Sequence, residues 1–324
     1  MQKEPAMRPV LRLAEPEKFD AEAKDLLASL FEVNETPVTD DTLQDALAQC
    51  DVFWYRLKFR LDKELLSKAR CKIIATPVTG IDQIDVDACK ALGISIVCLK
   101  GETEFLREIR ATAEHTLALT FALIRNISAA FESVKQGVWD RDRFPGIELY
   151  GKTVGIVGLG RLGTICAEYF RMLGMRVIGF DPRPSVPAWI ERKDTLADLL
   201  QESDLVSLHV VANASTDKLI GKNELSAINP NAFLINTSRG SIVCEESLLS
   251  ALKNKRLRGA ALDVLQNEGD INATHPLLQY AQSHDNLLLT PHLGGNTPES
   301  FQKTERFLAE QVVKMYTHIS GAAS

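Results

Sequence analysis

The sequence predicts an α/β protein with two doubly wound parallel-sheet domains, one of which is inserted into the other. Three observations lead to this prediction. Strand and helix signals alternate along both halves of the chain, a glycine-rich turn near residue 158 opens the second half, and an amphipathic stretch follows the last strand. Such alternation is typical of parallel sheets covered by helices on both faces. The length of 324 residues also favours two domains over one core.

The N-terminal third alternates between short apolar runs and amphipathic stretches, which predicts the first parallel sheet. The expected strands cover residues 10–14, 52–56, 72–75 and 94–98, and the expected helices cover residues 21–30, 63–69 and 84–92. A long helical stretch over residues 111–137 then leads into the second half.

The second half continues with apolar runs that are typical of buried strands. Beyond the glycine-rich turn they cover residues 205–209, 233–236, 259–263 and 287–290. Residues 300–319 form a final amphipathic helix, with Phe301, Leu308, Val312, Met315 and Ile319 on one face. Because a complete α/β unit precedes the glycine-rich turn, we expect this last helix to return to the N-terminal unit. The expected domains are therefore residues 1–115 with 297–324, and residues 116–296.

The glycine-rich turn carries the strongest functional signal in the chain. An apolar strand at residues 154–157 runs into Gly158-x-Gly160-x-x-Gly163 at the start of a helix, and a second apolar strand at residues 176–180 is followed directly by Asp181. Gly158 permits the tight turn, Gly160 lets the backbone approach a pyrophosphate, and Gly163 lets helix and strand pack closely. The free N–H groups and the dipole at the helix start attract phosphates. We therefore predict a Rossmann dinucleotide-binding domain, inserted into a flavodoxin-like domain.

Asp181 predicts which dinucleotide is bound. It lies 18 residues beyond Gly163, where a carboxylate would accept hydrogen bonds from both ribose hydroxyls of NAD. The same carboxylate would repel a 2′-phosphate. The sequence therefore favours NAD over NADP, and we expect replacement of Asp181 by Ala to relax that preference.

Composition and charge exclude several other classes of protein. The net charge of −6 provides no attraction to nucleic acid or to an anionic membrane. No apolar run approaches the length of a membrane span, and the N-terminus lacks an apolar signal core. The six cysteines are scattered without a Cys-x-x-Cys pair and mostly lie in apolar stretches. We expect a cytoplasmic protein without a metal site.

Polar side chains follow three strands of the second half, at the edge where open α/β sheets bind ligands. They include Arg239, Asp263, Glu268 and His292. Taken singly, Arg239 could be a surface cation, Glu268 a solvated loop acid and His292 a loop histidine. Together they suit proton transfer to a carbonyl oxygen beside a carboxylate, because arginine is a planar fork for carboxylates and histidine titrates near neutrality. A glutamate beside the histidine favours the imidazolium form. This chemistry complements hydride transfer from a nicotinamide.

Several short motifs occur in a fixed order along nearly the whole chain. They are Thr79-Gly80-Ile81-Asp82-Gln83-Ile84-Asp85, Ala113-Glu114-His115-Thr116, the glycine loop with Asp181, Ser238-Arg239-Gly240, Ala261-Leu262-Asp263-Val264 and Pro291-His292-Leu293-Gly294-Gly295. In these motifs the chain resembles the D-isomer-specific 2-hydroxyacid dehydrogenases. The resemblance implies an NAD-dependent oxidoreductase that interconverts a small 2-keto acid and a D-2-hydroxy acid.

The resemblance assigns roles to individual residues. Arg239 would hold the substrate carboxylate and keto oxygen, His292 would be the acid/base, and Glu268 would be its partner. Backbone N–H groups around Val78, Thr79 and Gly80 would cradle the carboxylate from the substrate domain. The remaining matching positions are expected to contact the cofactor, and His115 is expected to be structural. These cofactor positions are Arg161 and Leu162 at the pyrophosphate, Val210, Thr237, Ser238 and Asp263 on the nicotinamide side, and Gly294.

The sequence departs from the family pattern near the expected substrate pocket. Gly269 stands where relatives usually have proline, Val78 stands where they often have glycine, and residues 100–107 replace a short linker rich in Asn, Pro and Gly. The spacing from Asp263 to His292 is also longer than in many relatives. These departures leave the substrate open. Arg56, with Lys58, could extend the pocket toward a second anionic group, or could equally belong to a solvated strand end.

The resemblance also leaves alternatives to the expected enzyme. The same family includes NAD(H)-responsive corepressors, and it includes dehydrogenases of other donors such as phosphite or formate. The family implies a homodimer joined through the nucleotide domains, and the apolar, helix-rich segment over residues 111–134 supports that expectation.

Overall fold

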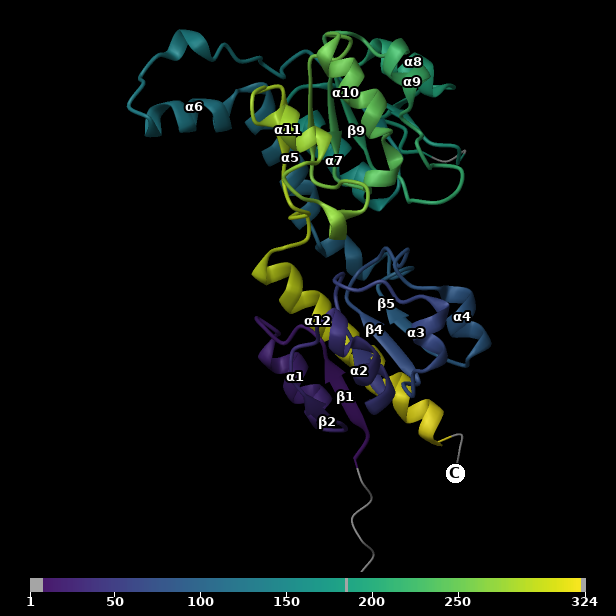
Figure 1. Ribbon diagram of the computed structural model, residues 1–324. Helices are drawn as coiled ribbons and strands as arrows, with labels where there is room; N and C mark the ends of the chain where they lie inside the picture. Colours follow the sequence, from purple (N-terminus) through teal and green to yellow (C-terminus); the bar gives the residue numbers. More distant parts are fainter. Residues whose placement is uncertain (1–7, 184–185, 322–324) are drawn as a thin grey trace, which may run out of the picture. The chain divides into compact units, whose positions relative to one another are not determined.

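The computed structural model describes residues 8–183 and 186–321, and the chain divides into two compact units (Figure 1). The first unit runs to Ile109 and resumes at Thr297, and the second covers Arg110–Asn296. The expected division after residue 115 falls inside a helix, α5, which begins at Ala111 and packs against strands of the second unit. A helix moves as one rigid element, which explains why the contacts divide the chain before it.

The first unit is built on a five-stranded parallel sheet with the order β2-β1-β3-β4-β5. This is the flavodoxin-like order, and it confirms the predicted class of this unit. The strands are β1 (Val10–Leu13), β2 (Glu32–Asn34), β3 (Val52–Trp54), β4 (Ile73–Thr76) and β5 (Ser95–Cys98). The α-helices are α1 (Ala21–Ala28), α2 (Leu43–Gln49), α3 (Lys63–Ser67), α4 (Val86–Ala91) and α12 (Pro298–Gly321). Strand β2 and helix α2 were not expected from the sequence.

Helix α12 returns to the first unit and covers one face of its sheet, beside α1 (Figure 1). Leu308 and Val312 are fully buried in the core that this face forms. The opposite face forms a second core, because successive side chains of a strand point to opposite faces. Met315 was expected on the apolar face of α12, and this prediction is wrong, because the residue is 36% exposed.

The second unit holds a seven-stranded parallel sheet with the order β12-β11-β10-β9-β6-β7-β8. The order reverses between β6 and β9, which is the switch point where doubly wound sheets bind ligands. The strands are β6 (Thr153–Val157), β7 (Arg176–Phe180), β8 (Glu191–Arg192), β9 (Leu205–Leu208), β10 (Phe233–Asn236), β11 (Gly259–Leu262) and β12 (Leu287–Leu289). The α-helices are α5 (Ala111–Ile124), α6 (Ile127–Lys135), α7 (Arg161–Met172), α8 (Leu196–Glu202), α9 (Lys222–Ala227), α10 (Glu245–Lys253) and α11 (Pro276–Ala281).

The long helical stretch expected over residues 111–137 consists of two helices. Helix α5 ends at Ile124, and Asn126 adopts a left-handed conformation with φ of 53° before α6 begins. Asparagine is among the few residues that tolerate this conformation, so the chain can turn there. Helix α6 and the segment after it extend outward from the second unit (Figure 1).

Among the described residues, no single helix is long and apolar enough to cross a bilayer. One bent pair of helical segments, Phe105–Ile124 with Ile127–Lys135, has the length and composition of a span when the two are taken together, and that is the only evidence for one.

Candidate active site

The glycine loop lies between β6 and α7, and two of its glycines are required by close backbone contacts. Gly158 has φ of +90°, and a Cβ atom there would lie 2.5 Å from the carbonyl oxygen of His209. A Cβ atom on Gly163 would overlap the carbonyl oxygen of Gly158. Gly160 differs, because the nearest atom to its Cβ position is Nη2 of Arg183 at 3.8 Å. The loop is therefore tightly packed at Gly158 and Gly163, and it is open at Gly160. A bound pyrophosphate requires this open space.

Helix α7 begins directly at this open loop. Its N-cap is Gly160, which offers no side chain to satisfy the first N–H groups, and its first turn contains no acidic residue. Uncapped N–H groups at a helix start are an anion-binding site. Arg161 and Leu162 form the start of the helix and are half-buried. The residues present thus fit the phosphates of a dinucleotide.

Asp181 follows β7 at the same edge, and its side chain is already held by several donors. One carboxylate oxygen accepts the Leu159 N–H at 2.7 Å and Nη2 of Arg183 at 2.7 Å. The other accepts the backbone N–H and Nε of Arg183, both at 2.9 Å. The Arg183 guanidinium, with backbone N–H groups of Arg183 and Leu159, outweighs burial and lowers the pKa of Asp181 to about 2. The carboxylate is therefore ionised at neutral pH.

The residues that follow strands β9 and β10 lie at the same end of the sheet as the glycine loop. Ser238 is buried, and its hydroxyl donates to the carbonyl of Leu208 at 2.6 Å, which joins the ends of the two strands. The hydroxyl of Thr237 hydrogen-bonds that of Thr116 on α5 at 2.9 Å. Val210 is half-buried just beyond β9. Burial lowers the pKa of His209 to about 3, so this histidine is neutral.

The side chains of His292 and Glu268 form a hydrogen-bonded pair at the end of the sheet that carries β11 and β12. Nδ1 of His292 lies 2.7 Å from Oε2 of Glu268, and the two side chains are 26% and 39% exposed. The backbone of His292 has φ of 54°, and its N–H donates to the carbonyl of Asp263 at 2.8 Å. The two residues that the sequence separates by 23 intervening positions therefore meet in space.

Asp263 holds the loop that carries His292. Its carboxylate is 1% exposed and accepts the N–H groups of Leu293 and Gly294, both at 2.8 Å. It also accepts the hydroxyl of Thr290 at 2.6 Å and lies 3.0 Å from Nε2 of His115. Burial alone would raise the pKa of Asp263, but these hydrogen bonds outweigh it and hold the pKa below its usual value. This network was not apparent from the sequence.

Arg239 follows β10, and its backbone is fixed on both sides. The side-chain amide of Asn236 donates to the Arg239 carbonyl at 2.9 Å, and a Cβ atom on Gly240 would overlap the carbonyl group of Leu265. Nη1 of Arg239 donates to the Ser238 carbonyl at 2.8 Å. The half-buried side chain therefore starts from the same edge as the glycine loop and His292.

The first unit carries the residues expected to bind substrate. Val78, Thr79 and Gly80 follow β4, and Thr79 is exposed. Arg56 instead forms a partly buried ion pair, with Nη2 lying 2.7 Å from Oε1 of Glu305 on α12. Its side chain is only 16% exposed, so the interpretation as a solvated strand end is wrong. The pair with Glu305 favours a structural role for Arg56 over substrate binding.

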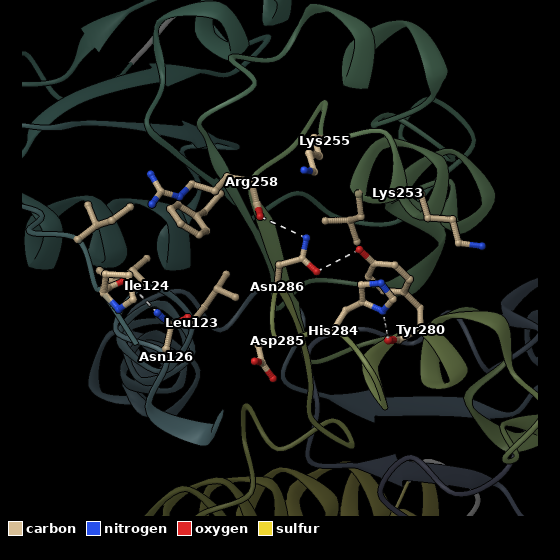
Figure 2. Close-up of a pocket in the computed structure, with 14 residues that line it drawn as sticks. Leu123, Ile124, Asn126, Lys253, Lys255, Arg258, Tyr280, His284, Asp285 and Asn286 are labelled. Carbon is tan, nitrogen blue, oxygen red and sulfur yellow. Dashed lines mark hydrogen bonds between the residues drawn. The ribbon is translucent and has the colours of Figure 1, made fainter. Parts of the chain in front are cut away.

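A cavity of about 500 Å³ opens at the end of the second unit's sheet opposite to the glycine loop (Figure 2). Arg258 and Asn286 line it directly before β11 and β12, and Tyr280 donates to the Asn286 side chain at 3.1 Å. The amino ends of the strands meet here, whereas the glycine loop and His292 lie at the carboxyl ends. This cavity is therefore separate from the candidate active site.

A doubly wound sheet with a glycine loop at its switch point and an ionised acid after the next strand defines a Rossmann dinucleotide-binding domain. Residues 117–294 match the family model described as "D-isomer specific 2-hydroxyacid dehydrogenase, NAD binding domain". The chain belongs to the D-isomer specific 2-hydroxyacid dehydrogenase family, and its second unit carries the NAD-binding domain.

Individual relatives support this assignment. The chain is 34% identical to a D-3-phosphoglycerate dehydrogenase of Methanocaldococcus jannaschii, covering 90% of this chain and 55% of that protein. It is 36% identical to a glyoxylate reductase of Aeropyrum pernix, covering 90% and 89%. The chain thus spans about half the length of the phosphoglycerate dehydrogenases that it matches.

Solved structures share the whole fold. D-lactate dehydrogenase of Aquifex aeolicus, complexed with NAD and lactic acid, has a TM-score of 0.80 and 27% identity, covering 96% of each chain. An acyclic imino acid reductase, Bsp5, in complex with NADPH and D-Arg, also has a TM-score of 0.80 and 27% identity, covering 96% of this chain and 97% of that one.

Proposed function

We propose that the protein is an NAD-dependent oxidoreductase that interconverts a 2-keto acid and a D-2-hydroxy acid. The observation that carries the proposal is the His292–Glu268 pair, at 2.7 Å, on the sheet edge that also bears the glycine loop and Arg239. A histidine held by a carboxylate can exchange a proton with a substrate oxygen. Family membership and the relatives' names support the same class of reaction.

Each side chain has a distinct task in this proposal. NADH, when bound, supplies the hydride. Arg239 binds the substrate carboxylate through its planar fork. Because Nδ1 of His292 is held by Glu268, we assign Nε2 to donate the proton to the keto oxygen during reduction. Glu268 stabilises the imidazolium before the transfer, and Asp263 fixes the loop on which His292 is carried.

We assign the first unit to substrate binding, through backbone N–H groups of Val78, Thr79 and Gly80 after β4. Arg56 is not included, because its guanidinium is committed to Glu305. The relatives' names mention phosphoglycerate, glyoxylate and lactate, which differ in size and charge. They support the class of substrate and leave its side chain open.

Steady-state assays with a panel of 2-keto acids and NADH test the proposal directly. We expect NADH oxidation with at least one of glyoxylate, hydroxypyruvate, pyruvate and 3-phosphohydroxypyruvate. Parallel assays offer formate and phosphite with NAD, since these donors define the second candidate chemistry. Turnover of formate or phosphite alone would overturn the 2-keto acid assignment. Tight NADH binding without any turnover would favour a sensor of NAD(H).

Glu268→Gln should shift the pH dependence of keto-acid reduction without abolishing turnover. The substitution keeps a hydrogen-bonding group near Nδ1 of His292 but removes the negative charge 2.7 Å away. The imidazolium is then less stable, so the alkaline limb of the kcat/KM profile should move to lower pH. Measuring the profile from about pH 5 to 9 checks this, with Glu246→Gln on α10 as a matched control. An unmoved limb would contradict the role given to Glu268.

Arg239→Lys should raise KM and also lower kcat, because a point charge cannot reproduce a bidentate fork. We expect kcat/KM to fall by about 10-fold or more, the size of one hydrogen bond to a charged group. Arg256→Lys, at an exposed position before β11, is the matched control and should leave both constants unchanged. Normal kinetics of Arg239→Lys with the true substrate would remove this residue from the site.

We propose that the protein is a homodimer joined through its second unit. The segment that includes α6 exposes several large apolar side chains, which a monomer rarely leaves in water. They are Ile127 (52% exposed), Phe131 (62%), Trp139 (88%) and Tyr150 (80%). Light scattering at micromolar concentration should give twice the chain mass, and Phe131→Asp with Trp139→Asp should give the monomer. A monomeric unmodified protein would disprove the proposal.

We also propose a cytoplasmic location. All six cysteines are free thiols, and four of them are buried, which is typical of proteins in reducing compartments.

A further inference from the structure

Glu268 is carried by a loop that has little support of its own. The loop connects β11 to α11, and from Asn267 to Thr274 every residue except Ile271 is exposed. The hydrogen bonds within it, such as the one from the Asp270 N–H to the Asn267 carbonyl at 2.8 Å, join residues two or three positions apart. The place of Glu268 beside His292 is therefore set mainly where the two ends of the loop meet the rest of the second unit.

One carboxylate, that of Glu245, contacts both ends of this loop. Its Oε1 accepts the backbone N–H of Gln266, two residues before Glu268, at 2.7 Å. Its Oε2 lies 3.2 Å from Nε2 of His275, the residue directly before α11. The side chains of Glu245 and His275 are only 18% and 17% exposed. Glu245 is the first residue of α10, and α10 packs against α11 (Figure 1).

The imidazole of His275 is suited to this contact. Its Nδ1 is buried and has no hydrogen-bond partner among the described residues. A proton on Nδ1 would be a buried donor without an acceptor, which costs about 1–3 kcal/mol. The proton of the neutral ring therefore belongs on Nε2, which faces Oε2 of Glu245. The Glu245 carboxylate thus faces a donor at each end of the loop.

The segment that leads into α10 also lies against the start of the loop. The side-chain amide of Gln266 donates to the Val243 carbonyl at 3.4 Å, in addition to the contact of its backbone N–H with Glu245. Because Arg239 begins this segment, Gln266 joins the part of the chain that carries Arg239 to the part that carries Glu268.

We propose that Glu245 is a positioning residue, whose carboxylate anchors both ends of the loop and thereby keeps Glu268 beside Nδ1 of His292. The role rests on the proposed function, because it acts through the Glu268–His292 pair. Loss of Glu245 should therefore disturb proton transfer in the same manner as loss of the Glu268 charge, and it should leave NADH binding at the glycine loop unchanged.

Hydrogen exchange measured by NMR tests the anchor without any substrate. In Glu245→Ala the backbone amide of Gln266 should exchange about 10-fold faster or more, because it loses a hydrogen bond to a charged acceptor. Glu246→Ala is the matched control, since it removes the next carboxylate of α10, which is exposed. Equal exchange of the Gln266 amide in the two variants would overturn the proposal.

The pH profile of kcat/KM tests the consequence for proton transfer. In Glu245→Ala the alkaline limb should move to lower pH, toward its position in Glu268→Gln, because the charge of Glu268 is no longer held beside the imidazole. Adding Glu245→Ala to Glu268→Gln should move the limb no further, since residues that act through one contact are not additive. A residue that only stabilises the fold would lower Tm and leave the limb in place. That result, or a further shift in the double variant, would refute the positioning role.

His275 supplies a second pair of variants, which also covers the case in which Glu245→Ala does not fold. His275→Gln keeps an N–H donor for Glu245, whereas His275→Leu removes it. We expect His275→Leu to move the limb part of the way and His275→Gln to leave it near its original position. Identical profiles for the two variants would count against the anchor.

Failure of the proposed function gives a different pattern of results. In that case Glu268→Gln itself leaves the limb unmoved, or no 2-keto acid is turned over. The positioning role would then fall together with the reaction, even where the exchange of the Gln266 amide still responds to Glu245→Ala. Failure of the anchor alone leaves the effect of Glu268→Gln intact and abolishes only the effects of the Glu245 and His275 variants.

Discussion

Replacing His292 with Ala should lower kcat for 2-keto acid reduction by about 10²–10⁴-fold, the usual contribution of a positioned acid/base group. The Kd for NADH should stay nearly unchanged, because the proposed partner of the imidazole is the substrate oxygen. The loop itself should persist, since Asp263 holds it through the N–H groups of Leu293 and Gly294. Single-turnover kinetics with the best keto acid, together with an NADH titration, would measure both quantities.

His284→Ala is the matched control for this variant. His284 is an exposed histidine of the same unit, and it lies at the amino ends of the strands against Tyr280 (Figure 2). Its removal should leave kcat unaffected. Near-normal turnover by His292→Ala would show that the catalytic assignment is mistaken and would favour a binding or sensing role.

Alanine substitutions at Gly160 and Gly163 should have opposite signatures, although the two glycines belong to one loop. At Gly163 the new Cβ would overlap the Gly158 carbonyl oxygen, so the backbone must shift. Overpacking of this kind costs about 1–3 kcal/mol, and Tm should fall by several degrees. At Gly160 the Cβ meets no atom within 3.8 Å, so Tm should hold, but NADH binding should weaken about 10-fold or more because the methyl group enters the pyrophosphate space.

Calorimetry for Tm and a fluorescence titration of NADH separate these two signatures. Gly295→Ala serves as the control, because its Cβ position is open and the residue lies outside the glycine loop. If Gly160→Ala bound NADH normally, the pyrophosphate could not lie above that residue. If Gly163→Ala kept its full stability, the tight approach of loop and helix would be in error.

Most of the strands were predictable, because buried parallel strands are short, apolar and bounded by polar turns. The predicted ranges match β7 and β10 to the residue and β6, β11 and β12 to within one residue at each end. The break between α5 and α6 was not predictable in the same way. The segment is apolar and helical on both sides, and one asparagine in the left-handed conformation, Asn126, decides the turn. Periodicity carries no information about a single backbone torsion angle.

For the candidate site, the sequence predicts which residues lie at the carboxyl ends of the strands, but it does not predict the contacts between them. Motif order brought Arg239, Glu268 and His292 together, because strand ends of a parallel sheet share one edge. Arg183 gave no such signal, because an arginine two residues after the acid has no recognisable role in the sequence. The structure shows that its guanidinium donates two hydrogen bonds to the Asp181 carboxylate. The ion pair of Arg56 is the clearest example of a contact that the sequence does not predict, because its partner Glu305 lies 249 residues away in the sequence.

The return of α12 to the first unit has a consequence for synthesis on the ribosome. One face of the first sheet is covered by Leu308, Ala309 and Val312, and Glu305 on the same helix forms the ion pair with the half-buried guanidinium of Arg56. These residues emerge only after the entire second unit has been made. We therefore expect the order of folding to reverse the order of translation. The second unit completes its fold first, and until α12 is made one apolar face of the first unit's sheet stays exposed to water. The nascent N-terminal segment is then the part of the chain most exposed to aggregation, and the part that a chaperone would bind for longest.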